Sequence, residues 1–205
     1  MIQVEHICKQ YTNHHHTVYA VNEVSFSVAE NERVGIAGGS GSGKSTLLKL
    51  IAMLEAPTSG TLQLFGADIT SIKNHRELYR SMQMMFQNPL AIIPPRMNLE
   101  AFLLEPYINY GLMDIAAAKE DIRKWIQHVD LPETIVQKYP HEVSGGQLQR
   151  VVLARIMLMH PKLVLFDEPT SALDAVNQKL VLDLLQKLHR EQPFGYVFVS
   201  HDIGL

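Results

Sequence analysis

The chain of 205 residues has a single cysteine, Cys8, and no long uninterrupted apolar run. One cysteine excludes an internal disulfide and fits a reducing compartment. The most apolar stretch, Leu99 to Ala118, is interrupted by acidic residues and Pro106, so it predicts no membrane span. Glu5 and Lys9 interrupt the N-terminus, and no secretory signal is expected there. The net charge is -3, which argues against nucleic acid as a bulk electrostatic partner.

What the sequence does contain is a glycine-rich loop between a predicted strand and a predicted helix. Gly38 to Thr46 matches G-x-x-x-x-G-K-[ST]. Arg33 to Ala37 is expected to form a short buried strand before the loop. Ser45 to Ala52 is expected to form a helix after it, with its N-terminus facing an anion. A Gly/Ser-rich linker needs no Lys-Ser-Thr at that register, so the context predicts a phosphate-binding loop.

The residue types of this loop suit a polyphosphate. Glycines let backbone N–H groups approach the phosphates without Cβ collisions. Lys44 is expected to reach the β- and γ-phosphates, and the Ser45 hydroxyl to ligate Mg²⁺. The predicted nucleotide-binding residues of the loop are Gly39, Ser40, Gly41, Gly43, Lys44, Ser45 and Thr46.

An acidic pair follows a second buried strand. Leu163 to Phe166 is apolar throughout and delivers Asp167 and Glu168 at its end. Such a pair suits phosphoryl chemistry, in which Asp167 holds Mg²⁺ and Glu168 orients or deprotonates the attacking water.

Two more predicted strands end in polar residues. Met82 to Phe86 ends at Gln87, and Gly195 to Ser200 ends at His201. Ligand contacts gather at the carboxyl ends of strands in open α/β sheets, although Gln87 could also be a simple strand terminator. Ser200, His201 and Asp202 are adjacent, so they cannot form a hydrolase triad. From its position at the end of a strand, His201 is instead expected to contact the γ-phosphate.

The stretch from Asn88 to Glu142 is rich in proline at its start and shows no strand pattern. It predicts a helical lobe inserted into the core, with a helix at Ile115 to Val129 that places Ile122, Trp125, Ile126 and Val129 on one face. Ser144-Gly145-Gly146 then leads into a helix at Leu148 to Met159, either as a second anion-binding helix N-terminus or as an ordinary N-cap followed by glycines. The expected domains are 1–87 with 160–205 and 88–159.

The remaining expectations concern secondary structure and one histidine run. We expect strands at Ile2 to Ile7, Asn22 to Val28 and Thr61 to Phe65, and helices at Arg76 to Ser81 and Ala175 to Arg190. In the last helix, Val176, Leu180, Leu184 and Leu188 are expected to face the core. His14-His15-His16 could bind a transition metal or form a solvated loop tip.

In this order the motifs resemble those of the nucleotide-binding subunit of ATP-binding-cassette (ABC) transporters. They are Walker A at Gly38 to Thr46, the Q-loop at Gln87, the signature at Val143 to Gln147, Walker B at Leu163 to Glu168, the D-loop at Ser171 to Asp174 and the switch histidine His201. The resemblance implies an α/β fold: a P-loop ATPase core with an inserted α-helical lobe and an N-terminal antiparallel β region.

The resemblance also implies roles for individual residues. Tyr11 would stack on adenine, although Tyr19 lies nearby in the sequence. Gln87 would act in catalysis and help Ser45 and Asp167 to hold Mg²⁺. The signature residues Ser144, Gly145, Gly146 and Gln147 would contact the ATP of a partner subunit.

Phe86-Gln87-Asn88-Pro89, Pro95-Arg96 and Ser144 to Arg150 are similar to the dipeptide, oligopeptide and nickel importer group. This implies an ATPase that binds ATP and Mg²⁺ at the cytoplasmic face of the cell membrane. The implied partners are a second ATPase subunit, identical or different, two permeases and an extracytoplasmic binding protein, with no nucleic acid.

Two other functions compete with transport. One is a soluble cassette ATPase of DNA repair or of ribosomes, and the other is an accessory of a multi-subunit enzyme such as a phosphonate-degrading complex. A complete subunit of the family continues beyond the switch histidine, whereas this sequence stops at Leu205, so we expect the C-terminal end of the fold to be truncated.

Overall fold

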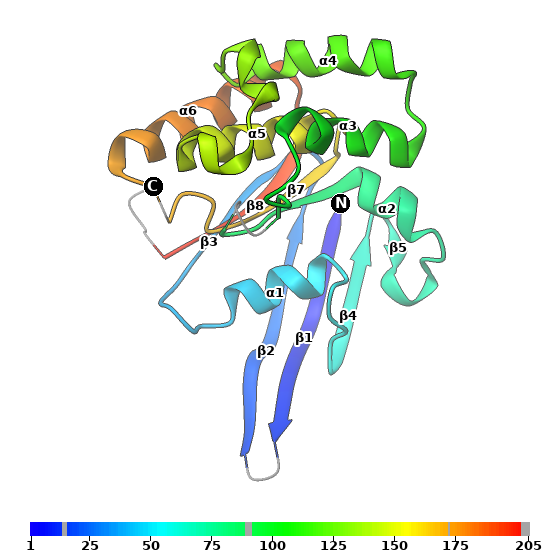
Figure 1. Cartoon of the computed structure of the whole chain (residues 1–205). Coiled ribbons are helices and arrows are strands. Elements are labelled where there is room, and N and C mark those ends of the chain that lie inside the picture. Colours follow the sequence, from blue (N-terminus) through cyan, green and yellow to red (C-terminus); the bar gives the residue numbers. More distant parts are fainter. Residues whose placement is uncertain (14–15, 89–91, 172, 202–205) are drawn as a thin grey trace. The chain divides into compact units, whose positions relative to one another are not determined.

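The computed structural model describes residues 1–13, 16–88, 92–171 and 173–201 (Figure 1). Its contacts divide the chain into two compact units, which we describe separately. The first comprises Met1–Met84, Lys162–Glu168 and Phe194–Leu205, and the second Met85–Pro161 and Pro169–Pro193. The boundaries expected from the sequence, 1–87 with 160–205 and 88–159, stay a prediction.

The first unit contains an antiparallel sheet with the strand order β2-β1-β4-β5 (Figure 1). The strands are β1 (Ile2–Asn13), β2 (His16–Val28), β4 (Ser59–Leu64) and β5 (Ala67–Asp68). Ile2 pairs with Val28 on one side and with Leu64 on the other, and all three side chains are buried. One face of the sheet therefore lies on the core, as is common for antiparallel sheets.

The three strands expected in this region are present, but β1 and β2 are longer than the sequence predicts. The pairing of β1 with β2 shifts register between Val4 and Ile7 and again on each side of Lys9. Each bulge interrupts the alternation of buried and exposed side chains while backbone pairing continues. A prediction based on alternation therefore ends the first strand at Ile7.

A second sheet has the order β3-β8-β7-β6, with β8 parallel to both of its neighbours. The strands are β3 (Arg33–Ala37), β6 (Met82–Met85), β7 (Leu163–Asp167) and β8 (Gly195–Ser200). Every residue of β7 is buried, which is typical of a strand inside a parallel sheet. The expected α/β class and antiparallel region are confirmed.

Helix α1 (Lys44–Ile51) lies against the antiparallel sheet in the first unit (Figure 1). Leu48, Leu50 and Ile51 are fully buried and share one core cluster with Ile2 and Leu62 of the sheet. The 3₁₀ turn η1 (Ile69–Ser71) and helix α2 (His75–Ser81) follow β5. The phosphate loop thus connects β3 to a helix that is fixed by its buried face.

Apart from Met85 at the end of β6, the regular structure described in the second unit consists of helices and 3₁₀ turns. These are α3 (Leu99–Tyr110), α4 (Ile115–His128), η3 (Glu133–Gln137), η4 (Pro140–Glu142), α5 (Gly145–Met157) and α6 (Ala175–Glu191). None of the described helices is long and apolar enough to cross a membrane. The expected helical lobe is confirmed.

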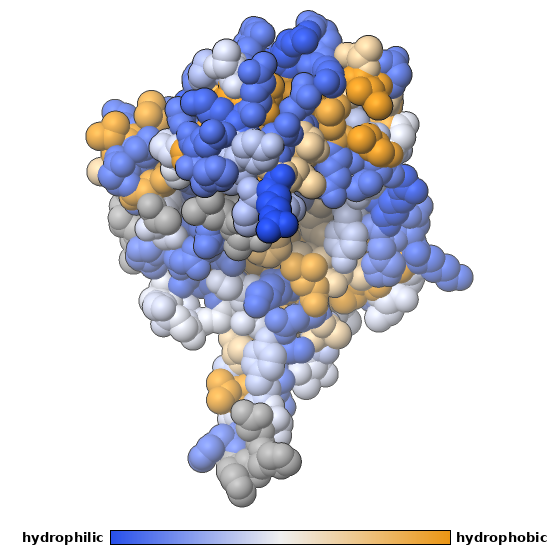
Figure 2. Space-filling view, viewed as in Figure 1, coloured by the Kyte–Doolittle hydropathy of each residue, from blue (hydrophilic) through white to orange (hydrophobic). Residues whose placement is uncertain are grey.

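Apolar side chains gather on the surface over the end of α3 and the start of α4 (Figure 2). Ile108, Met113 and Ile115 are exposed in this region. A few exposed apolar side chains are normal on folded proteins, so this turn alone indicates no partner.

The buried face of α6 differs from the expected one. Val176 is 71% exposed and Leu180 49% exposed, whereas Val181, Leu184, Leu185 and Leu188 are buried. Residues four apart are rotated by about 40° around a helix, so a series built from steps of four drifts off the buried face. The assignment of Val176 and Leu180 to the core is wrong.

Candidate active site

The strands of the parallel sheet bring three of the predicted motifs to one edge. Asp167 pairs with Val199, and Ala37 pairs with Ser200. The loop after β3, the residue after β7 and the residue after β8 therefore begin at nearly the same level. Ligand sites of open α/β sheets lie at this carboxyl edge. All three segments belong to the first unit.

The phosphate loop depends on a glycine at its last position. Gly43 has φ 91°, and a Cβ at this position would lie 1.8 Å from the backbone oxygen of Ala20 in β2. Gly43 is also the N-cap of α1, and among the described residues no side chain caps this helix or adds an acid to its first turn. The first N–H groups of α1 can therefore bind an anion.

Lys44 places its charge inside the loop. The side chain is buried, and Nζ donates to the carbonyl oxygens of Gly38 and Gly39 over 2.7 Å each. A buried ammonium next to free helix N–H groups concentrates positive potential, which is the electrostatic requirement for a polyphosphate.

Ser45 and Asp167 supply oxygen atoms for a metal ion. The Ser45 hydroxyl donates to Oδ1 of Asp167 over 2.7 Å. Burial raises the pKa of the Asp167 carboxyl, while the hydrogen bond from Ser45 lowers it. Hydroxyl and carboxylate oxygens are the ligands that Mg²⁺ prefers, and a cation here would offset the cost of the buried carboxylate. The residues present therefore fit Mg²⁺.

Glu168 and His201 form the next contact along this edge. Oε2 of Glu168 lies 3.3 Å from Nδ1 of His201, and the N–H of Glu168 donates to the Val199 oxygen over 3.1 Å. Glu168 has φ 47°, a conformation that costs energy for a side chain of this size and often marks functional sites. A carboxylate held this way can accept a proton from water.

Tyr11 lies on β1 and is 43% exposed as a whole residue. Tyr11 pairs with Val18, whereas Tyr19 pairs with Gln10, the residue before Tyr11. Because side chains alternate along a strand, Tyr11 and Tyr19 point to opposite faces of the hairpin. The Tyr11 hydroxyl donates to Oε2 of Glu55. No local sequence pattern marks Glu55, which lies 44 residues from Tyr11.

Gln87 and the D-loop meet in the second unit, where Nε2 of Gln87 donates to the Ser171 hydroxyl over 3.3 Å. The structure does not place Gln87 relative to the first unit, so its expected roles in catalysis and metal binding stay predictions. Ala172 of the D-loop lies outside the described residues.

The signature forms the start of α5 in the second unit. Ser144 caps the helix by accepting from the Gln147 N–H, and Gln147 Oε1 accepts in return from the Ser144 N–H. A Cβ at Gly146 would lie 2.9 Å from Oδ1 of Asn177, whereas one at Gly145 would meet nothing. The N-cap interpretation is therefore confirmed, and contact with a nucleotide stays a prediction.

The histidine run gives no metal site that we can describe. His14 and His15 lie outside the described residues. Within residues 1–13, 16–88, 92–171 and 173–201, no three His, Cys, Asp or Glu side chains are grouped to hold a metal ion.

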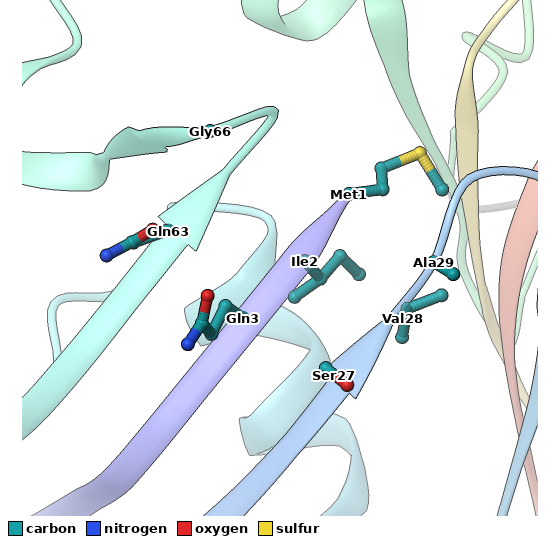
Figure 3. Close-up of a pocket in the computed structure, with 8 residues that line it drawn as sticks. All are labelled: Met1, Ile2, Gln3, Ser27, Val28, Ala29, Gln63 and Gly66. Atoms are coloured by element: carbon teal, nitrogen blue, oxygen red, sulfur yellow. The ribbon is translucent and has the colours of Figure 1, made fainter.

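A separate pocket of about 230 Å³ lies on the first unit (Figure 3). The polar side chains that line it are Gln3, Ser27 and Gln63, from three neighbouring strands. No charged side chain is among its lining residues. A polyphosphate needs cationic or N–H partners, so the phosphate loop is the better nucleotide site.

Comparisons with known proteins agree with this geometry. Residues 21–171 match the family model described as ABC transporter. The chain is 39% identical over 193 residues to the di/tripeptide transport ATP-binding protein DppF of Pseudomonas aeruginosa, covering 93% of this chain and 60% of that protein. It is 37% identical over 191 residues to the oligopeptide transport ATP-binding protein AppF of Bacillus subtilis, covering 92% and 58%. The chain thus spans less than two thirds of both relatives.

The fold also matches a solved structure. The ATP-binding cassette MJ0796, determined as a dimer in a post-hydrolysis state with ADP and phosphate, has a TM-score of 0.89 and 30% sequence identity. The match covers 100% of this chain and 89% of that one.

Proposed function

The chain belongs to the ABC transporter family, and from that premise we propose that it is the ATP-hydrolysing subunit of a peptide importer. The observation that carries the proposal is the grouping of Lys44, the Ser45–Asp167 pair and the Glu168–His201 pair at one edge of the parallel sheet. This set supplies a phosphate-binding charge, metal ligands and a proton acceptor.

Binding of ATP rests on the loop and on α1. Lys44 and the first N–H groups of α1 hold the β- and γ-phosphates, and Ser45 with Asp167 holds Mg²⁺. A bound Mg²⁺ supplies positive charge to the phosphate oxygens. Tyr11 offers its exposed ring to the adenine.

Hydrolysis rests on the acid at the end of β7. Glu168 orients the attacking water and accepts its proton, and His201 fixes the Glu168 carboxylate while it contacts the γ-phosphate. Gln87 is further proposed to act in catalysis, and the signature of a neighbouring subunit is proposed to contact this ATP. ATP then closes a pair of cassettes, and hydrolysis reopens them.

The assignment of peptide as cargo rests on the relatives. Those reported above are named for di/tripeptide and oligopeptide transport, rather than for nickel or for a soluble enzyme complex. The proposed assembly has two cassettes, two permeases and an extracytoplasmic binding protein, at the cytoplasmic face of the membrane. The dimeric state of the solved cassette supports the pairing of two cassettes.

The test is ATP turnover by this chain in an assembly with its permeases, with and without peptide-loaded binding protein. We expect Mg²⁺-dependent hydrolysis that peptide stimulates and that Lys44→Ala abolishes. Stimulation of ATP hydrolysis by a nickel chelate but not by peptide would overturn the assignment of peptide as cargo. Turnover that survives Lys44→Ala would overturn the site.

A further inference from the structure

Tyr11 is held in place by a carboxylate that no sequence motif contains. Its hydroxyl donates to Oε2 of Glu55. The hydroxyl end of Tyr11 is therefore held by Glu55, which follows α1 in the chain.

Glu55 is itself fixed to the same helix. The N–H groups of Leu54 and Glu55 both donate to the Lys49 oxygen, over 2.9 and 3.3 Å. The carboxylate of Glu55 lies 3.7 Å from Nζ of Lys49 and 3.7 Å from Nζ of Lys9. Glu55 thus joins β1, which carries Tyr11 and Lys9, to the end of α1.

The same contacts leave Tyr11 partly exposed. Nζ of Lys9 lies 5.2 Å from the ring centroid and donates to the Ala56 oxygen over 2.8 Å, so this cation is also held. Tyr11 as a whole residue stays 43% exposed. An aromatic ring that is anchored at its hydroxyl and partly exposed offers a flat surface to a base without losing side-chain freedom on binding.

We propose that Glu55 is a positioning residue, which holds the Tyr11 hydroxyl and so presents the ring to the nucleotide base at a fixed offset from the phosphate loop. The inference rests on the proposed function, because it takes ATP as the ligand. It adds that part of the affinity for the base depends on a side chain that touches neither base nor phosphate.

A purely structural role for Glu55 and a positioning role predict different effects of its loss on ligand binding. If Glu55 only fastened the β1–β2 hairpin to α1, its loss would disturb the loop and weaken every phosphate ligand. If Glu55 acts through Tyr11, its loss weakens binding of a nucleotide and spares binding of a phosphate chain that has no base. Tripolyphosphate is the matching probe without a base.

The experiment measures dissociation constants of ATP and of tripolyphosphate for the full chain by calorimetry. Tyr11→Phe and Glu55→Ala should each weaken ATP binding by about 3- to 10-fold, the size of one hydrogen bond, with tripolyphosphate unchanged. Tyr11→Phe combined with Glu55→Ala should weaken ATP binding no more than either alone, because both remove one contact. Glu55→Gln keeps a carbonyl acceptor and should restore most of the ATP affinity.

Glu30→Ala, a change of an exposed glutamate in the same unit, is the control and should alter neither constant. Equal weakening of ATP and tripolyphosphate, full additivity of the two changes, or unchanged ATP affinity in Glu55→Ala would each overturn the positioning role. A wild-type chain that binds neither probe would instead overturn the proposed function.

Discussion

The Ser45 hydroxyl donates to Oδ1 of Asp167 over 2.7 Å, although the two residues lie 122 positions apart in the chain. The bond joins the first turn of α1 to the last residue of β7. It satisfies one carboxylate oxygen of Asp167, a residue that is only 7% exposed. The same two side chains are the proposed Mg²⁺ ligands, so the site holds a buried negative charge that a cation would neutralise.

Asp167→Asn should therefore stabilise the protein while it inactivates the enzyme. The amide oxygen can still accept from Ser45, and the variant no longer buries a carboxylate whose pKa is raised by desolvation. We expect the free energy of unfolding without Mg²⁺ to rise by roughly 0.5–2 kcal/mol and Mg²⁺-dependent hydrolysis to be lost. Urea denaturation and a phosphate-release assay check the two effects. A less stable variant would show that the carboxylate is not a net cost to folding.

Lys44→Ala should lose most of the affinity for ATP and for tripolyphosphate. The change removes the ammonium that lies against the Gly38 and Gly39 carbonyls inside the loop. Binding of a fluorescent ATP analogue measures the loss, which we expect to exceed tenfold for a charge-assisted contact. Lys73→Ala, which changes an exposed lysine of the same unit, is the matched control. Unchanged binding in Lys44→Ala would remove this loop from the nucleotide site.

Glu168→Gln should bind ATP and hydrolyse it at least 100-fold more slowly. The amide keeps the size of the side chain and can still contact His201, but it cannot take a proton from water. Calorimetry and single-turnover hydrolysis in the assembled complex separate binding from chemistry. Near-normal turnover would mean that another group is the base.

The features of this site that depend on short segments could be predicted from the sequence, whereas those that depend on contacts between distant segments could not. The strand ends could be predicted because apolar runs such as Leu163 to Phe166 stop at polar residues, and parallel strands bring such ends to one edge. Walker A depends on consecutive residues, and Gly43 stands where the backbone needs φ 91°. These features are properties of short segments, so the sequence alone reveals them.

The missed features all depend on contacts between distant segments. The contact of Glu55 with Tyr11 depends on the pairing of β1 with β4 and on the turn that follows α1. Neither can be derived from the residue types near position 55. The opposite facing of Tyr11 and Tyr19 follows from the pairing of β1 with β2, which residue types alone do not give.

Asp174 gives a prediction about pH. It caps α6 by accepting from the N–H groups of Val176 and Asn177 over 3.0 Å each. The hydrogen bonds from Asn177 contribute most to holding the pKa of the Asp174 carboxyl below its ordinary value. A lowered pKa adds stability above the pKa of the unfolded chain, and this stability is lost as pH falls through the folded value.

Asp174→Ala should therefore lower the urea midpoint at pH 7, and the difference from the wild type should shrink as pH falls below about 4. Asp174→Asn keeps a neutral cap, so its urea midpoint should stay close to that of the wild type at pH 7. This variant should not show the fall in stability at low pH that protonation of the Asp174 carboxylate causes. A deficit of Asp174→Ala that does not change with pH would show that the charge of the cap contributes nothing.

The signature should act on the ATP of a neighbouring subunit. In this chain the phosphate loop already supplies a helix N-terminus to its own ATP, and Ser144 caps a second one at α5. A second anion-binding terminus is useful if it closes over the γ-phosphate of a partner cassette, where its N–H groups stabilise negative charge. Ser144→Arg places a large side chain where the partner's γ-phosphate would bind. Ser144→Asp keeps the helix cap but repels the phosphate.

Mixing two inactive variants tests this model. Neither Ser144→Arg nor Lys44→Ala should hydrolyse ATP alone. In a mixed pair, the Lys44 site of the Ser144→Arg chain faces the intact signature of the Lys44→Ala chain, so about one site per pair should recover. If the partner cassette is a different protein, the lysine change is made in its phosphate loop instead. Ser144→Thr, which keeps the capping hydroxyl, is the control and should stay active on its own. A mixed pair that stays inactive, while both chains still assemble, would mean that the signature serves its own Lys44 site.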